Sequence, residues 1–279
     1  MNGYLGTILR VDLTAGRLWD EPLNEDYARG FVGGSGLAAR YVYDMVDAGT
    51  DPLGPDNPLV FMAGPLVGTV MPSAGRYSVG GLSPLTRLWG EANSGGFFGP
   101  ELRFAGYDGL IVTGQAARPV WLAIVAGRAE LRDAGELWGL DSYATQERAR
   151  QALGEPKARV ACIGVAGERL VRLGAVMNDA GRSAARTGLG AVMGSKRLKA
   201  IAVRGSAAVP VADAAALQAV AREVNAFAKE DMASASIRLA GTAGALDVSL
   251  MYGDLPIRYF QQGEWAEAGN LSGVLMAEQ

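Results

Sequence analysis

Three segments of the chain concentrate glycine, small polar residues and arginine, the residue types that can enclose a phosphate group. They cover residues 63–77, 91–99 and 177–196. Small residues let backbone N–H groups converge on an anion, and a guanidinium offers a fork of donors to phosphate oxygens. In the third segment Arg182 and Arg186 precede an expected helix start near Gly188, where the helix dipole would favour an anion. The three segments therefore predict a ligand that carries phosphate.

Each segment taken alone is also compatible with glycines that only make turns and arginines that only face solvent. None of the three has the glycine-lysine-serine/threonine spacing of a Walker A loop, and none is a GxGxxG pattern directly after a strand. A single glycine pattern of this kind is weak evidence for a ligand. The prediction therefore depends on the three segments acting together.

The counts of cysteine and histidine exclude several kinds of site. The chain has no histidine and one cysteine, Cys162, which lies in an apolar, strand-like run and is expected to be a buried structural thiol. Without histidine there is no Ser-His-Asp triad and no His-ligated metal site. One cysteine cannot hold an iron–sulfur cluster or form a disulfide within the chain.

Composition indicates a folded chain without affinity for polyanions. Hydrophobic residues make up 49% of the sequence, the net charge is −3 and the sequence pI is about 5.2. This balance gives no bulk attraction to nucleic acid or to an anionic membrane. No apolar run is long enough to span a bilayer, and residues 1–4 lack the features of a signal peptide. We therefore expect a cytoplasmic protein.

Periodicity up to Gly205 predicts many short strands separated by glycine turns, with few helices. A helix capped by Ser35 is expected to carry Leu37, Ala38, Tyr41 and Val42 on one side. The expected strands are 7–13, 17–19, 60–63, 76–79, 109–113, 120–125, 128–131, 160–163, 170–176 and 199–203. No internal repeat is visible in the residues themselves.

The character of the sequence changes after Gly205. Residues 206–211 read as a connector, Asp213 as the N-cap of a helix with Leu217, Val220 and Val224, and residues 272–279 as a further helix. We predict an α+β fold: an N-terminal domain, residues 1–208, of two mixed or antiparallel β-sheets with a few helices. Residues 209–279 are expected to begin an incomplete α-helical domain.

The order and spacing of the motifs resemble the N-terminal domain of the tungsten-containing aldehyde:ferredoxin oxidoreductase family. The resemblance extends over nearly the whole chain. It is carried by the segments 3–6, 9–13, 34–38, 64–66, 75–77, 83–86, 92–96, 104–108, 164–168 and 190–196.

The resemblance implies a cofactor of two molybdopterin dithiolenes around one tungsten, with magnesium bridging their phosphates. It implies that Asn93 and Ser183 bind the magnesium through backbone carbonyls, and Ser183 replaces the alanine associated with this place. Cofactor contacts are implied for Arg76, Asn93, Gly95, Arg182, Ser183, Ala185 and Arg186. Arg76 is expected between the pterin and a [4Fe–4S] cluster.

The family reaction oxidises an aldehyde to a carboxylic acid and passes electrons through that cluster to ferredoxin. The cluster cysteines and the catalytic residues are not matched in this chain, so no catalytic residue is assigned and the [4Fe–4S] cluster is expected only in the full-length enzyme. We expect a fragment, inactive alone, that needs the missing helical domains or a partner chain and can form a homo-oligomer.

Three alternatives remain open at this point. The chain could be part of an aromatic acyl-CoA reductase of the same family. It could be a non-catalytic module that binds a phosphate-bearing ligand, or assembles with a partner. It could also be a purely structural domain whose glycine loops hold no ligand.

Overall fold

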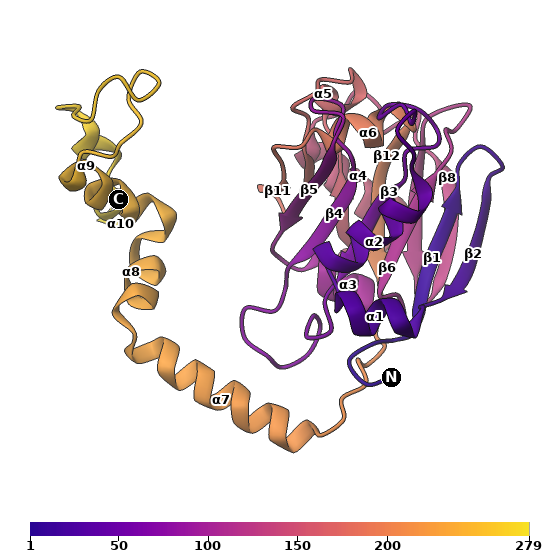
Figure 1. Ribbon diagram of the computed structural model, residues 1–279, viewed down its shortest axis with the longest axis horizontal. Coiled ribbons are helices and arrows are strands. Elements are labelled where there is room, and N and C mark those ends of the chain that lie inside the picture. The colour runs from indigo at the N-terminus through magenta and orange to yellow at the C-terminus, as the bar shows by residue number, and fades with distance from the viewer. Residues whose placement is uncertain (279) are drawn as a thin grey trace. The chain divides into compact units, whose positions relative to one another are not determined.

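The computed structural model describes residues 1–278 and forms two compact units, Met1–Ala214 and a second that begins at Ala215. The first unit contains two six-stranded sheets with helices, so the predicted α+β fold is confirmed (Figure 1). Among the described residues, no helix is both long and apolar enough to cross a membrane.

The first sheet contains the N-terminal half of this unit, in the order β2-β1-β6-β3-β4-β5. Neighbouring strands are antiparallel except β1 and β6, which are parallel. The strands are β1 (Thr7–Asp12), β2 (Arg17–Pro22), β3 (Leu59–Ala63), β4 (Tyr77–Leu82), β5 (Trp89–Ser94) and β6 (Gly109–Thr113). Strand β5 forms one edge of the sheet.

The second sheet contains the rest of the unit, in the order β11-β10-β9-β12-β7-β8. Here only β7 and β12 are parallel. The strands are β7 (Val120–Val125), β8 (Arg128–Asp133), β9 (Arg159–Cys162), β10 (Val176–Asn178), β11 (Arg182–Ala184) and β12 (Leu198–Arg204). Strand β11 forms one edge of this sheet.

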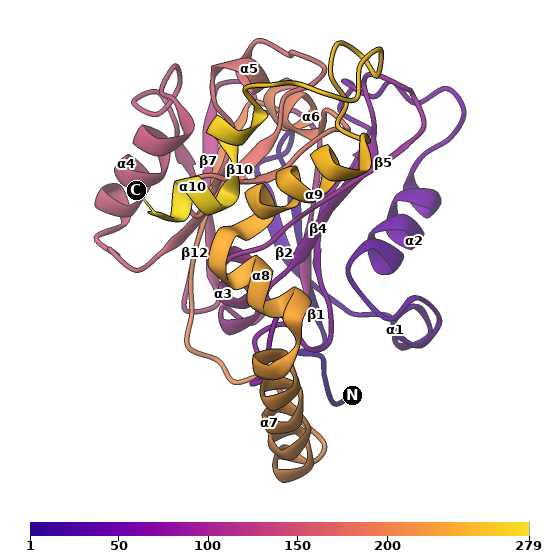
Figure 2. The same ribbon diagram turned by 90° about the vertical axis from the view of Figure 1, so that its left-hand side faces the viewer.

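Helices cover the outer faces of both sheets and fill the space between them. Outside lie α1 (Glu25–Phe31) and α2 (Ser35–Met45) on the first sheet and α4 (Ser142–Leu153) on the second, and Figure 2 shows them on opposite sides. Between the sheets lie α3 (Phe98–Phe104) and α6 (Leu189–Ser195), which contribute Phe98, Leu102 and Val192 to the central core. The central strands are thus buried on both faces, which explains their continuous apolar runs.

Successive side chains of each central strand alternate between the central core and the outer clusters. Phe61 faces the central core and Met62 the helices outside, as do Ala161 and Cys162 in β9. Cys162 is fully buried, and burial raises the pKa of its thiol to about 12. This agrees with the predicted structural role of Cys162.

The two sheets have the same topology, strand for strand. Each begins with a hairpin whose first strand is parallel to the last strand of its half, and each ends in a three-stranded antiparallel run. The backbone bonds correspond as well: Ala63 N donates to Asp108 O (3.0 Å) and Ile163 N to Lys199 O (3.1 Å). The first unit is therefore a structural repeat of β1–β6 and β7–β12, which was not visible in the sequence because pairing and burial repeat rather than residue identity.

Most expected strands are present, but two local predictions are wrong. Residues 170–175 do not form a strand, because Leu170 is left-handed (φ 56°) and Gly174 N closes a turn onto Val171 O (2.7 Å). Ser35 does not cap α2; Gly34 takes that position, while the Ser35 hydroxyl contacts Ser78 Oγ (3.0 Å) and Glu91 Oε1 (2.9 Å).

The second unit consists of short helices after one long helix. Helix α7 (Ala214–Glu230) confirms the helix predicted from Asp213, and Val220, Val224 and Phe227 on it are exposed. It is followed by α8 (Met232–Ala240), η1 (Gly241–Gly244), α9 (Ala245–Tyr252), η2 (Ala268–Leu271) and α10 (Gly273–Glu278). The helix predicted over 272–279 is present as α10; Gln279 lies outside the described residues.

A buried carboxylate ties the N-terminal segment to the first sheet. Asp108, at the start of β6, accepts hydrogen bonds from the backbone N–H groups of Leu5 (3.0 Å) and Gly6 (2.7 Å) and forms an ion pair with Arg103. Arg103 is fully buried and also donates to Gly3 O (2.7 Å). Lys199, the equivalent of Asp108 in the second half, forms a buried ion pair with Glu168.

Replacing Asp108 should destabilise the first unit strongly. Asp108→Ala leaves the Arg103 guanidinium buried without its partner, and losing one member of such a pair costs about 3–5 kcal/mol. Denaturant unfolding followed by circular dichroism measures the effect. The matched control is Arg118→Ala, which removes an exposed pair with Asp133 and should change stability by less than about 0.5 kcal/mol. Equal losses of stability in Asp108→Ala and Arg118→Ala would contradict the stabilising role of the buried Arg103–Asp108 pair.

A buried lysine gives stability a defined dependence on pH. Lys196 is fully buried, and Nζ donates to Pro55 O (3.1 Å) and Gly114 O (3.2 Å). Burial lowers its pKa to about 8, against the opposing effect of Asp56. Between pH 8 and the ordinary lysine value near 10.5, the unfolded chain binds a proton that the folded chain has lost, so stability rises with pH there.

The lysine contribution is isolated by the variant Lys196→Met. The stability difference between variant and wild type should be largest below pH 8 and shrink as pH rises, by a total on the order of 3 kcal/mol. The comparison with the variant is needed because Cys162, whose pKa is raised to about 12, acts in the opposite direction above pH 9. Chemical unfolding at pH 7 to 10.5 measures the difference in unfolding free energy between Lys196→Met and the wild type. A difference that does not change with pH would contradict the lowered pKa of Lys196.

Candidate functional site

The edge strands of the two sheets lie side by side, and the three glycine-rich segments meet there. A Cβ on Gly96 would lie 2.8 Å from Arg182 Cδ, and a Cβ on Gly90 would lie 3.2 Å from Thr187 Cβ. Gly96 lies just beyond β5, and Gly90 near the start of that strand. Strand β11 therefore runs antiparallel to β5 without being hydrogen-bonded to it in one sheet. We call this contact between β5 and β11 the seam.

Four predicted site residues come together at one end of the seam. Arg76 Nη1 donates to Asn93 Oδ1 at 2.6 Å. A Cβ on Gly95 would lie 3.6 Å from Arg182 Nη1 and 4.0 Å from Arg76 Cγ. Two arginine side chains thus approach the backbone at Gly95 from the two halves of the fold, Arg182 with its guanidinium and Arg76 with its aliphatic chain.

The glycines at this end of the seam are required by close approach. Gly96 is left-handed (φ 99°), and a side chain there would collide with the Asp179 carboxylate and Arg182. A Cβ on Gly75 would lie 2.7 Å from Gly96 O. These contacts join the first segment to the second and the second to the third.

The repeat makes the predicted binding residues equivalent in pairs. In the first half Met62 pairs with Ser78 and Ser78 with Asn93. In the second half Cys162 pairs with Met177 and Met177 with Ser183. Asn93 and Ser183 therefore hold the same place on β5 and β11, and two residues further on Gly95 corresponds to Ala185.

The arginines on the second half of the seam have no partner within the described part of the chain. Arg182 and Arg186 are exposed, and neither side chain makes a hydrogen bond or ion pair with residues 1–278. Arg186 is left-handed (φ 81°) and lies beside Thr187, so along β5 it lies toward Gly90 and away from Gly95. The four-residue spacing thus spreads the two arginines along the seam and does not bring them together on a helix.

The helix after Arg186 does not contribute its N-terminus to an anion site. Helix α6 begins at Leu189, as expected near Gly188, but Gly190 N donates to Gly174 O (3.0 Å). A Cβ on Gly190 would lie 2.5 Å from Ala175 O. Gly188, Gly190 and Gly194 instead let α6 pack tightly against neighbouring backbone, at Arg172, Ala175 and Gly167.

A pocket of about 490 Å³ opens next to the Arg76 end of the seam. It is lined by residues from the start of α2, from the first glycine-rich segment, and by Arg76, Ser78 and Asn93. Sequence reasoning did not assign Ser35 or Ser78 to the site, although Gly33-Gly34-Ser35-Gly36 is the kind of small-residue run that signals close backbone approach.

Two further residues at the seam were in a predicted segment but were given no role. Asn178 is fully buried, and Asp179 next to it accepts hydrogen bonds from Phe97 N (2.6 Å) and Phe98 N (3.2 Å). Arg159 Nη1 contacts the other oxygen of Asp179 at 3.2 Å. Their partners at residues 94–98 lie 81 to 84 residues away in the chain, so no local pattern could have identified them.

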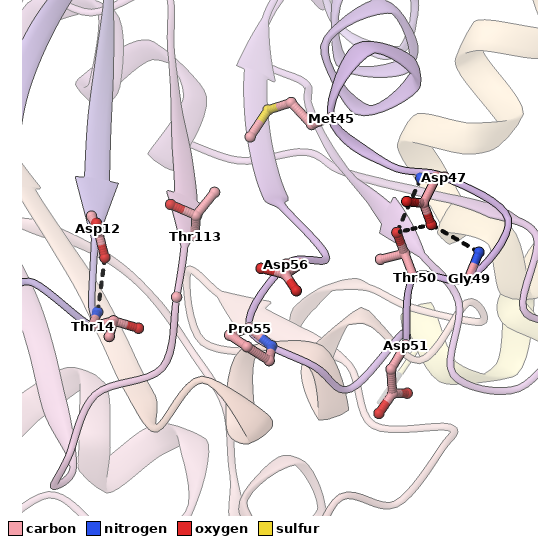
Figure 3. A pocket seen from close by; sticks show the side chains of 11 residues that line it. Asp12, Thr14, Met45, Asp47, Gly49, Thr50, Asp51, Pro55, Asp56 and Thr113 are labelled. Carbon is pink, nitrogen blue, oxygen red and sulfur yellow. Dashed lines mark hydrogen bonds between the residues drawn. The ribbon is translucent and has the colours of Figure 1, made fainter.

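A larger hollow of about 1040 Å³ lies elsewhere, between the ends of β1 and β6 and the loop before β3 (Figure 3). Three of its four aspartates are occupied in turns: Asp12 accepts from Thr14 N (2.9 Å), Asp47 from Gly49 N (2.8 Å) and Asp51 from Leu53 N (3.1 Å). Across residues 1–278 no three acidic, cysteine or histidine side chains are grouped to hold a metal. The hollow therefore offers no comparable set of ligands.

Comparison with known proteins agrees with this geometry. Residues 8–205 match the family described as aldehyde ferredoxin oxidoreductase, N-terminal domain. A tungsten-containing aldehyde ferredoxin oxidoreductase of Pyrococcus furiosus is 43% identical over 278 residues, which are 99% of this chain and 46% of the relative. The WOR-like subunit of an aliphatic sulfonate oxidoreductase from the same organism is 35% identical, over 94% of this chain and 44% of that protein.

A solved structure shares the fold as well. The active site complex BamBC of benzoyl coenzyme A reductase, in complex with 1,5-dienoyl-CoA, superimposes with a TM-score of 0.80 and 37% identity, covering 82% of this chain and 35% of that chain. The fold and the matches define an oxidoreductase domain. The chain belongs to the aldehyde ferredoxin oxidoreductase family, and it spans about half the length of the curated relatives that it matches.

Proposed function

We propose that the seam binds a tungsten-bis-molybdopterin cofactor through its two phosphates and one magnesium ion. The observation that carries this proposal is the equivalence of Asn93 and Ser183 on two antiparallel edge strands. A ligand built of two like halves around one metal matches a protein surface built of two like halves. A ligand with a single phosphate would use only one of them.

The donors at the seam fit such a ligand chemically. Magnesium prefers oxygen ligands, and the backbone carbonyls of Asn93 and Ser183 would supply one from each half. Arg76, Arg182 and Arg186 would contact the phosphates and pterins, since a guanidinium donates in a planar fork. Gly95 and Ala185, with little or no side chain, would let the ligand approach the backbone. Serine can replace alanine at position 183 because the atom proposed to bind magnesium is the backbone carbonyl oxygen, which both residues have.

When bound, the tungsten centre supplies the two-electron oxidation of an aldehyde to a carboxylic acid. The residues of this chain bind and orient the cofactor from one side, and none of them is assigned a proton transfer. The Arg182 guanidinium, which has no ion-pair partner among residues 1–278, is free to take up the negative charge of a phosphate. Arg76 is held by Asn93, so its direction is set before the ligand arrives.

The whole protein is proposed to be an aldehyde oxidoreductase that uses ferredoxin as electron acceptor in the cytoplasm. Residues 1–208 would be its tungstopterin-binding domain and residues 209–279 the start of a helical domain. The single cysteine is buried, so [4Fe–4S] ligands would come from helical domains or a partner chain beyond these residues, and the chain alone would be inactive. Assembly into a homo-oligomer is part of the same proposal.

One specific observation supports a second candidate function. The similar solved structure is a benzoyl coenzyme A reductase complex at 37% identity. The same seam could therefore serve an aromatic acyl-CoA reductase. A non-catalytic module that binds phosphate or pterin is a remaining alternative. Metal and pterin analysis of the purified protein would distinguish such a module from a purely structural domain that holds no ligand.

The proposal predicts different effects for two substitutions at the seam. Arg182→Ala removes a charge-assisted bond worth about 1.5–3 kcal/mol, so cofactor binding should weaken roughly ten- to a hundred-fold. Asn93→Ala should cost less, because the backbone carbonyl survives, although the bond from Arg76 is lost. Tungsten and pterin content of the protein joined to its helical domains measures both, beside thermal stability.

Arg118→Ala, far from the seam in the sequence and exposed, serves as the control for loss of a surface arginine. Full occupancy in Arg182→Ala would refute the phosphate contact. Equal losses in Arg182→Ala and Asn93→Ala, with lowered thermal stability, would indicate collapse of the seam and not loss of a ligand bond.

A further inference from the structure

We propose that Asn178 is a positioning residue that sets the separation of β5 and β11, and through it the choice of divalent cation at the seam. The inference rests on the proposed function, since it concerns the cation shared by Asn93 and Ser183. It is carried by the hydrogen bonds of one buried amide that joins the two sheets.

The side chain of Asn178 is fully buried and all its bonding capacity is used. Its Oδ1 accepts from Tyr77 Oη (3.1 Å) and Ser94 Oγ (2.7 Å). Its Nδ2 donates to Gly95 O (2.9 Å) and Asp179 Oδ2 (2.9 Å). A primary amide has two donors and two acceptor sites, so none is left over.

Three of these four partners belong to the other sheet. Asn178 lies on β10, whereas Tyr77 is on β4, Ser94 is on β5 and Gly95 follows β5. Asn178 pairs with Arg182 across the β10–β11 hairpin, and Asn93 directly precedes Ser94. This amide therefore joins β5 directly to β10, and the pairing of β10 with β11 extends the link to the strand that carries Ser183.

Neighbouring contacts hold the hairpin that carries Asn178. Asp179 bonds the backbone at Phe97 and Phe98 on the opposite half. Gln146 of α4, which is 2% exposed, accepts from Ala180 N at 3.1 Å. The hairpin is thus fixed from both sides, and Asn178 lies at the point where it meets β5.

The fold itself does not require asparagine at this position. By the register of the repeat, Asn178 corresponds to Val79 on β4, which is fully buried in the central core. The equivalent place in the first half is thus filled by an apolar residue. A buried amide carries a desolvation cost that valine does not, so its presence in one half only indicates a role at the seam.

The separation of β5 and β11 matters for the cation because magnesium tolerates little error. It demands near-ideal octahedral geometry at about 2.0–2.1 Å, whereas calcium accepts flexible geometry at about 2.3–2.6 Å. Two carbonyls held at a fixed separation can satisfy the strict geometry of magnesium, whereas mobile carbonyls suit the flexible geometry of calcium. If β5 and β11 can move apart, the affinity for Mg²⁺ falls more than the affinity for Ca²⁺, and the site still binds a cation.

The test uses Asn178→Val in the 279-residue chain, with Mg²⁺ or Ca²⁺ titrated calorimetrically in the presence of inorganic phosphate. Valine keeps the residue type found at Val79 and adds no charge. We expect Mg²⁺ affinity to fall roughly ten- to a hundred-fold, as for other residues that orient metal ligands, and Ca²⁺ affinity to change much less. Ser94→Ala, which removes one of the four bonds, should give a smaller shift in the same direction and guards against misfolding of the first variant.

The matched control is Asn57→Val. Asn57 is also fully buried and also bridges backbone groups, at Pro52 O (2.7 Å) and Leu82 O (3.1 Å), but Leu82 pairs with Trp89 at the other end of β5, away from Asn93 and Gly95. It should lower thermal stability without changing the ratio of Mg²⁺ to Ca²⁺ affinity. An unchanged ratio in both Asn178→Val and Ser94→Ala, or an equal change in Asn57→Val, overturns the inference. A wild-type chain that does not prefer Mg²⁺ overturns the proposed cation site itself.

Discussion

The contact between the edge strands β5 and β11 is the constraint on which the rest of the site depends. Each strand ends a separate sheet, and no ladder of backbone bonds joins them. What holds them together is the central core, to which both contribute, a small set of side-chain bonds from Asn178 and Asp179, and glycines that permit close approach. Because edge strands retain unpaired backbone groups, their meeting leaves N–H and carbonyl groups for a ligand.

The repeat explains why this contact can serve a ligand with two like halves. Two copies of one strand topology place Asn93 and Ser183 at corresponding positions. The copies differ where the ligand and the seam require it: Val79 in one half is Asn178 in the other, and Arg182 takes the place of Ala92. The core fixes the shared topology, and the seam carries the differences.

Local patterns predicted those parts of the molecule that depend on local physics. Strands buried on both faces, such as β3 and β6, appear as apolar runs, and the prediction of a phosphate-bearing ligand combined the three glycine-rich segments that meet at the seam. Helix α4 was not predicted because its sequence is mostly polar, although Asp141 caps it and Gly154 ends it. No role for Asn178 was predicted because its hydrogen bonds depend on how distant strands are aligned. That alignment is set by tertiary packing rather than by neighbouring residues.

The most direct test of a two-fold ligand site is the composition of the cofactor in the protein joined to its helical domains. Quantitative mass spectrometry of metals and released pterin gives the ratio of pterin, tungsten and magnesium per chain. The equivalence of Asn93 and Ser183 predicts two pterins, one tungsten and one magnesium, since in the proposed binding mode each half of the seam holds one phosphate and both share the cation. One pterin per tungsten, or cofactor bound without magnesium, would contradict the account.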